Sequence, residues 1–225
     1  MEHMRPADIE RESMKIIDKE LAAQGIVLET ETAAVVKRVI HTTADFDYVH
    51  NLRFTPQAVE KGVAALGGGV VVTDTNMALS GVSKPALARL GAAAHCFMAE
   101  PETAEQAKAA GTTRAAAAVL RAEAEFSNRA VMAVGNAPTA LLRIADRMEA
   151  GWRPALVIGV PVGFVNVVES KERLWEICTR LGVPAIVALG RKGGSNVAAA
   201  ICNALLYTAT GLLDPSSRNE RKEKA

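Results

Sequence analysis

The sequence has few aromatic residues, almost no excess charge and no long hydrophobic run, and each shortage excludes a class of protein. Aromatic residues make up only 4% of the 225 residues, which argues against a base-stacking surface for nucleic acid. The formal net charge is +1, so no general attraction to nucleic acid or to an anionic membrane is expected. No apolar run approaches the length of a membrane span. We therefore expect neither a nucleic-acid partner nor a membrane partner.

Cysteines are also scarce. Cys96, Cys178 and Cys202 lie far apart in the sequence and form no CxxC pair, which disfavours a metal site built on thiolates. The segment Met1–Pro6 lacks the apolar stretch of a signal peptide. An odd, scattered cysteine count without a signal peptide predicts a reduced, cytoplasmic protein.

Short strands that are apolar throughout alternate with helical segments along most of the chain. We expect the strands near residues 70–73, 93–98, 130–134, 155–160 and 185–189. This alternation predicts a mainly parallel sheet of about five strands with helices on both faces. The expected fold is therefore one three-layer, doubly wound α/β domain over residues 1–213, and this domain begins with a helical N-terminal segment. The charged residues 214–225 are expected to form a disordered tail.

Two helices are expected before the first strand. The first runs from about Pro6 to Gln24 and contains Ser13, and a serine inside a helix usually faces solvent or bonds to the preceding turn. The second is expected to be capped by Thr30-Glu-Thr32 and runs into His41. The pKa of histidine lies near neutrality, so His41 can both give and take a proton, although a histidine at a helix end is more often structural.

Polar segments rich in glycine and proline follow four of the strands, at residues 73–76, 135–139, 161–164 and 190–196. In open parallel sheets, ligands bind outside the carboxyl ends of the strands, near the point where the strand order reverses. In and beside the first three segments, the candidate ligand-binding residues are Asp74, Thr75, Met77, Asn136, Thr139, Gly163 and Phe164. Asn136 and Thr139 could equally cap the helix that begins near Pro138, and Met77 and Phe164 could belong to the core.

The segment Gly190-Arg-Lys-Gly-Gly-Ser-Asn196 carries the strongest binding signal. Two cations and several backbone N–H groups at one helix start can form an anion site. Its candidate binding residues are Arg191, Lys192, Gly193, Gly194 and Ser195. An ordinary turn with solvent-facing basic residues would show the same pattern. The segment matches neither of the common glycine-rich nucleotide-binding motifs.

Several familiar enzyme classes are excluded by their missing motifs. The sequence has no GxSxG nucleophile elbow and no HExxH zinc motif. His41, Asp45, Asp47 and His50 lie close together, but their spacing matches no recognised metal site, so no protein-held metal is expected. His50 and His95 are expected to be structural.

Five blocks of sequence, in order, resemble the precorrin-8X methylmutase family. They are Lys37–Asp47, Thr73–Gly81, Gly135–Leu141, Gly159–Phe164 with Glu169-Ser-Lys171, and Gly190–Ala199. The resemblance spans nearly the whole chain, from the helix with Glu12-Ser13 to Tyr207. The forms His-Thr-Thr-Ala-Asp-Phe and Gly-Arg-Lys-Gly-Gly-Ser look most like the cobalt-precorrin-8 enzymes of the anaerobic cobalamin pathway.

The resemblance implies a cofactor-free isomerase that acts on a tetrapyrrole, precorrin-8X or cobalt-precorrin-8. Such an enzyme moves a methyl group from an α-carbon of pyrrole ring C to the adjacent β-carbon. The resemblance also implies a flavodoxin-like fold and a homodimer with its sites near the subunit interface. It makes His41 the proton donor and acceptor and places Ser13 in contact with the substrate. Asp45 or Thr42 could orient His41, a hypothesis that rests on their proximity in the sequence.

The substrate implied by the resemblance bears many carboxylates. The cations expected to bind them are Arg114, Arg191 and Lys192. Two other functions remain open alongside the isomerase. One is a corrinoid carrier that binds the ring without chemistry. The other is a nucleotide-binding α/β enzyme, indicated only by the glycine-rich strand ends.

Overall fold

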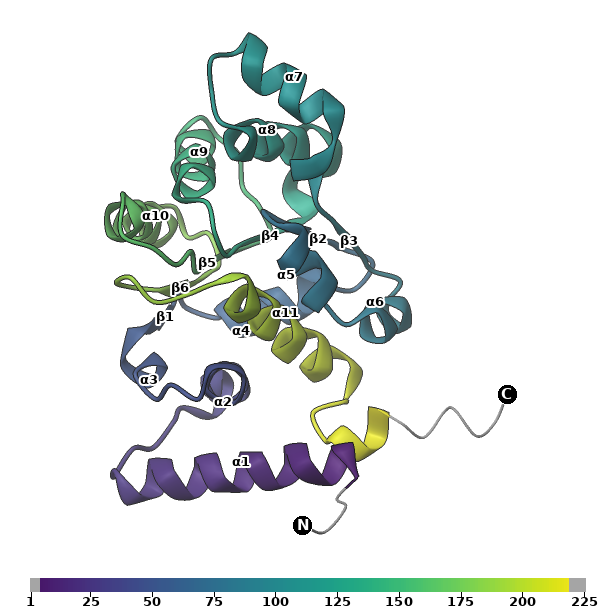
Figure 1. Cartoon of the computed structure of the whole chain (residues 1–225), viewed down its shortest axis with the longest axis vertical. Helices are drawn as coiled ribbons and strands as arrows, with labels where there is room; N and C mark the ends of the chain where they lie inside the picture. The colour runs from purple at the N-terminus through teal and green to yellow at the C-terminus, as the bar shows by residue number, and fades with distance from the viewer. Residues whose placement is uncertain (1–4, 219–225) are drawn as a thin grey trace.

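One six-stranded sheet organises the computed structural model, which describes residues 5–218 (Figure 1). Within these residues the strands are β1 (Leu52–Phe54), β2 (Val70–Thr73), β3 (Ala93–His95), β4 (Ala130–Val134), β5 (Leu156–Gly159) and β6 (Ala185–Ala188). The helices are α1 (Pro6–Ala23), α2 (Thr30–Thr43), α3 (Tyr48–Asn51), α4 (Ala58–Ala65), α5 (Asn76–Gly81), α6 (Lys84–Leu90), α7 (Pro101–Ala109), α8 (Arg114–Phe126), α9 (Pro138–Glu149), α10 (Val167–Leu181) and α11 (Ser195–Thr210). Short 3-10 helices are η1 (Phe97–Ala99), η2 (Ser127–Arg129) and η3 (Pro215–Arg218).

The strands lie in the order β1-β6-β5-β4-β2-β3. The five strands expected from the sequence are present, and each pair among them is parallel. The strand expected near residues 93–98 ends at His95, because the chain turns into η1 at Phe97. β1 was not expected. It is three residues long, pairs antiparallel with β6 at the edge of the sheet, and is too short to show a periodic pattern. The strand order reverses between β2 and β4, because the chain moves from β2 to β3 on one side and to β4, β5 and β6 on the other.

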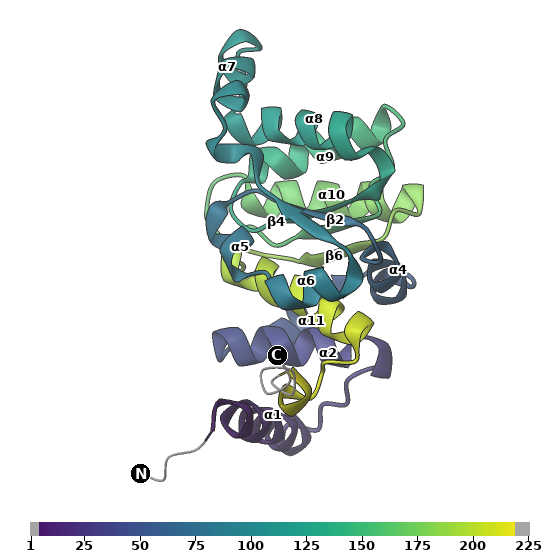
Figure 2. The ribbon, with the colours of Figure 1, turned by 90° about the vertical axis from the view of Figure 1, so that its right-hand side faces the viewer.

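Helices cover both faces of the sheet, as Figure 2 shows. Helices α8, α9 and α10 lie on one face, and α4, α5, α6 and α11 lie on the other. The three layers are therefore confirmed around the sheet. Helix α2 packs outside α11, and α1 lies outside α2, so the N-terminal segment adds further layers on that side.

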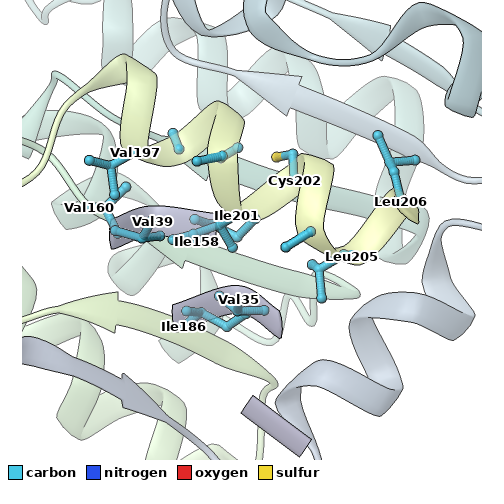
Figure 3. Packing of buried hydrophobic residues seen from close by; sticks show 14 of the residues in the cluster. Val35, Val39, Ile158, Val160, Ile186, Val197, Ile201, Cys202, Leu205 and Leu206 are labelled. Atoms are coloured by element: carbon cyan, nitrogen blue, oxygen red, sulfur yellow. The ribbon is translucent and has the colours of Figure 1, made fainter. Parts of the chain in front are cut away.

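Helix α2 is anchored in the main hydrophobic core. Its Val35 and Val39 are fully buried in the cluster that contains Ile201 and Leu205 of α11 and Ile158 of β5 (Figure 3). Burying one side chain of this size stabilises the fold by about 1.5–3 kcal/mol. The turn of α2 that carries the catalytic candidate is therefore held as firmly as a core helix.

The pairing of β1 with β6 brings the end of α2 to the carboxyl edge of the sheet. Leu52 pairs with Ala188, and the Leu189 amide donates to the Asn51 carbonyl at 2.9 Å. Because the pairing is antiparallel, the residues that precede β1 lie beside those that follow β6. The segment that follows His41 therefore lies next to the loop that begins at Gly190.

Two expectations, one for the start of α2 and one for the C-terminal residues, need correction. Helix α2 begins at Thr30 with Glu29 at its N-cap and no side-chain cap, so Thr30-Glu-Thr32 does not cap it. Residues 214–218 were expected in a disordered tail, but Pro215–Arg218 form η3, which packs against α1. The rest of the expected tail, residues 219–225, lies outside the described residues. None of the helices within residues 5–218 has both the length and the hydropathy needed to cross a membrane.

Candidate active site

A serine–histidine pair joins α1 and α2. The Oγ of Ser13 lies 2.8 Å from Nδ1 of His41. The expectation that Ser13 faces solvent or bonds to its own preceding turn is therefore wrong, because its hydroxyl bonds His41 on another helix. Its hydroxyl can fix the orientation and the tautomer of the imidazole. Within residues 5–218, Nε2 of His41 has no hydrogen-bond partner, which leaves it available for proton exchange.

The hypothesis that Thr42 or Asp45 orients His41 is wrong in this structure. The Thr42 hydroxyl donates back to the Arg38 carbonyl at 2.9 Å, as helical threonines commonly do. The Asp45 carboxylate accepts from Lys192 at 2.6 Å. Proximity in the sequence failed because His41 is still helical, so its side chain meets α1 rather than the loop that follows.

The surroundings of His41 disfavour its charged form. Burial lowers the pKa of the imidazole below its ordinary value of 6.5, and the Arg38 guanidinium lowers it further. The Glu10 carboxylate acts in the opposite direction without reversing the shift. The imidazole is therefore neutral at pH 7, and once protonated it is a stronger acid than an exposed histidine.

Lys192 connects the segment after His41 to the glycine-rich loop at residues 190–196. Its Nζ lies 2.6 Å from Asp45 Oδ2 and 2.6 Å from Asp47 Oδ2. Hydrogen bonding to Lys192 holds the pKa of Asp45 below its usual range. Lys192 was expected to bind substrate carboxylates, but here two carboxylates of the chain already neutralise it.

A buried lysine holds the same loop from beneath. Lys171 of α10 is fully buried, and its Nζ donates to the carbonyls of Gly190 and Lys192 at 2.8 Å each. Burial without a carboxylate partner lowers its pKa to about 8. Lys171 is thus a loop-positioning residue that side-chain type alone did not single out, although the block Glu169-Ser-Lys171 was part of the family resemblance.

Two glycines let this loop pack closely against the loop after β5. A β-carbon at Gly193 would clash with the Val160 carbonyl oxygen. The amide of Gly194, at φ +137°, donates to the same oxygen at 2.9 Å. Gly163, at φ +148°, donates its amide to the Arg191 carbonyl at 3.2 Å. The candidate residues of the two loops therefore do lie together, and their glycines are required for backbone packing.

Asp74 follows β2 and bonds the loop after β4, at the point where the strand order reverses. Its buried carboxylate accepts the backbone amides of Gly135, Asn136 and Ala137 at 2.7–2.8 Å. Burial raises the pKa of this carboxyl even though the three amides oppose the shift. Both oxygens are occupied, so Asp74 braces the loop after β4 rather than binding a ligand.

Three other polar candidates also bond within the chain. Thr75 caps α5 by accepting from the Ala78 amide, and its Oγ1 lies 2.8 Å from Ser195 Oγ. Thr139 accepts a hydrogen bond from Thr113 at 3.0 Å. Ser195 is buried, so its hydroxyl joins the β2 and β6 loops instead of facing outward.

The outward-facing candidates form the rim of this edge. Met77 is 73% exposed and Phe164 is 83% exposed, so neither belongs to the core. The Arg191 guanidinium lies 5.5 Å from the centre of the Phe164 ring. Arg114 and Asn136 are also exposed. Apolar surface beside free cations suits a large, partly apolar ligand that carries carboxylates.

Two other histidines, His50 and His95, lie within residues 5–218. His95 pairs with Glu100 at 2.7 Å and packs against the Phe97 ring at an interplanar angle of 51°, and His50 is exposed. No cluster of three or more histidine, cysteine or acidic side chains suited to a metal ion occurs among residues 5–218.

Fold and site together define an α/β protein with a serine-bonded imidazole on the helix that leads to the carboxyl edge of a mainly parallel sheet. The family model that describes precorrin-8X methylmutase matches residues 8–208. The chain belongs to the precorrin-8X methylmutase family.

Relatives and a solved structure agree with this assignment. The chain is 49% identical to the cobalt-precorrin-8 methylmutase of Salmonella typhimurium over 77% of this chain and 80% of that one. It is 40% identical to the cobalt-precorrin-8 methylmutase of Leptospira interrogans over 95% of this chain and 96% of that one. The crystal structure of precorrin-8x methyl mutase from Thermus thermophilus superposes with a TM-score of 0.81 at 40% identity. The superposition covers 90% of this chain and 98% of the Thermus thermophilus chain.

Proposed function

We propose that the chain is a cobalt-precorrin-8 methylmutase, an isomerase of cobalamin biosynthesis that moves one methyl group within its tetrapyrrole substrate. The observation that carries the proposal is the contact between Ser13 and His41 in a chain of this family. The cobalt form of the substrate is supported by the names of the Salmonella and Leptospira relatives. The cobalt would belong to the substrate ring and would need no ligand from the protein.

The chemistry assigned to His41 is reversible proton transfer. The imidazole would first take up a proton, and the imidazolium would then donate it from Nε2 to a conjugated nitrogen of the bound ring while Ser13 holds Nδ1. The protonated ring is electron-poor, so the methyl group migrates with its bonding electron pair from the α-carbon of ring C to the β-carbon. The proton then returns to His41, and no atom is gained or lost. General acid–base catalysis is typically worth about 10²–10⁴-fold, and holding the ring in its reactive shape supplies the remainder.

The rim of the sheet edge would bind the substrate. Arg114 and Arg191 are exposed cations for its carboxylates, and Met77 and Phe164 are exposed apolar side chains for the face of the ring. Lys192 is paired with two carboxylates, so its role would be to hold the loop near His41.

The finer features of fold and assembly are part of the same proposal. The order of the five parallel strands supports a flavodoxin-like arrangement, since counted from β2 it reads 2-1-3-4-5. The exposed side chains of Val162 and Val165 support a homodimer, because a second copy could cover them. Three buried, unpaired cysteines support a cytoplasmic location. Light scattering after size exclusion would distinguish a dimer from a monomer.

The function is tested by supplying the two substrates in parallel. Cobalt-precorrin-8 and metal-free precorrin-8X are each incubated with the protein, and the absorption spectrum is followed. The protein is then denatured, and the recovered tetrapyrrole is characterised by NMR, because an isomerisation leaves the mass unchanged. We expect conversion to the cobyrinate-type ring, faster with the cobalt substrate. Recovery of unchanged tetrapyrrole from both incubations would indicate a carrier and contradict the proposal.

A further inference from the structure

A cluster of three charged side chains joins α1, α2 and η3 beside the Ser13–His41 pair. Arg38 Nη2 lies 2.7 Å from Glu10 Oε1. Arg218 Nη1 donates to the two oxygens of Glu10 at 2.9 and 2.8 Å. All three side chains are largely buried, with 11–19% of each exposed. Charges this far from solvent interact strongly, because water screens them little.

The aromatic ring of Tyr207 completes the cluster from α11. The guanidinium carbon of Arg218 lies 3.9 Å from the ring centre, and that of Arg38 lies 5.1 Å from it. Arg218 also donates to the carbonyls of Leu212 and Leu213. Arg218 is thereby fixed by groups on both sides, although it lies beyond residue 208, where the family match ends.

The cluster shares its helices with the pair. Glu10 stands three residues before Ser13 on α1, and Arg38 stands three residues before His41 on α2, so each lies one turn from a member of the pair. We propose that Glu10, Arg38 and Arg218 position α1 against α2 so that Ser13 reaches His41, and that their balance of charge sets the acidity of the imidazole. The catalytic meaning of this inference rests on the proposed function. The positioning of the two helices and the effect of the charges on His41 can be tested without any turnover.

The charges act on His41 in opposite directions. Burial and Arg38 lower the pKa of His41, Glu10 raises it, and Arg218 lowers it. Two cations against one carboxylate leave a net positive charge that disfavours the imidazolium. These are the charged groups that act on His41 from α1, α2 and η3, and the Tyr207 ring of α11 lies against the two arginines. Removing Arg218 should therefore raise the pKa of His41, and removing the charge of Glu10 should lower it.

The test is an NMR titration of His41 in the full-length protein. The chain has only four histidines, so the ring signals of ¹³C-labelled protein can be assigned with one His41→Gln variant. We expect the midpoint to move up in Arg218→Met and down in Glu10→Gln. The matched control is Arg11→Gln, which removes an α1 cation that pairs with Asp8 and Asp214 instead of Glu10, and it should leave the midpoint unchanged.

A second variant keeps the test decisive if Arg218→Met unfolds. Arg218→Lys retains the charge and should leave the midpoint near that of the unmodified protein. Midpoints of Arg218→Met and Glu10→Gln that both stay fixed, or that move the same way, would overturn the proposal, and so would a midpoint of Arg218→Lys that moves as far as that of Arg218→Met. The titration needs no substrate, so an inactive protein would refute the proposed function and leave this inference standing. The pH profile of kcat should follow the same two shifts where turnover is observed.

Discussion

Ser13 Oγ and His41 Nδ1 lie 2.8 Å apart, although the two residues come from different helices. The contact depends on the packing of α1 against α2, because Ser13 lies on α1 and His41 lies on α2. It occupies one nitrogen of the imidazole and leaves Nε2 without a partner among residues 5–218. An oriented imidazole with one available nitrogen can both take up a proton and pass it on, as reversible proton transfer requires.

Replacing Ser13 by alanine should lower kcat by roughly two- to tenfold. One hydrogen bond of this kind contributes about 0.5–1.5 kcal/mol, and each 1.36 kcal/mol on the barrier is a factor of ten. If Ser13 acts only by orienting His41, KM should change little. Steady-state kinetics of Ser13→Ala beside Ser80→Ala, an exposed serine of α5, measures both parameters. A kcat equal to that of the control variant would contradict the orienting role.

Lys171 should make the free energy of unfolding vary with pH in the alkaline range. Burial lowers its pKa from 10.5 to about 8, so between these values the unfolded chain binds more protons than the folded chain. Stability should therefore rise as pH increases from about 8 to about 10.5. The neutral amine still has two N–H groups for the two carbonyls that it bonds. Urea unfolding at pH 8 and pH 10 should show the rise in the unmodified protein and a smaller one in Lys171→Met. Equal pH dependence in both would show that Lys171 does not titrate in this range.

Replacing Lys192 by glutamine should affect activity more than stability. The lysine is exposed, and pairs of this kind contribute about 1 kcal/mol or less to the free energy of unfolding. The pair with Asp45 and Asp47 nevertheless links the segment after His41 to the glycine-rich loop. We expect kcat at saturating substrate to fall by up to about tenfold. Lys15→Gln, which breaks the exposed pair with Glu12, serves as the control. Equal kcat values in the two variants would contradict the proposal that Lys192 positions the loop.

The sheet was predictable because its strands carry their own signal. The strands β2, β4, β5 and β6 are buried on both faces, and their apolar runs show this directly. β1 gave no such signal, since its three residues lie at an edge and differ in burial. Its pairing is nevertheless what places the residues after His41 beside the loop at Gly190.

The candidate site was predictable in position and less so in roles. The polar strand ends do lie at one edge, but Asp74 proved to bond three backbone amides rather than a ligand. Which groups a buried carboxylate accepts depends on the packing of two loops, and residue type cannot show it. Glu10 and Arg218 are 208 positions apart in the sequence, so no local pattern could indicate their contact. The same holds for Ser13, whose partner is 28 positions away.

Single-turnover conversion of bound cobalt-precorrin-8 by His41→Ala tests the central claim most directly. The variant should bind the tetrapyrrole with nearly unchanged affinity and convert it at least about 10²-fold more slowly, the lower end of what general acid–base catalysis supplies. His50→Ala, an exposed histidine of the adjacent α3, should convert it at the unmodified rate. Full conversion by His41→Ala at the rate of the unmodified protein would contradict the account.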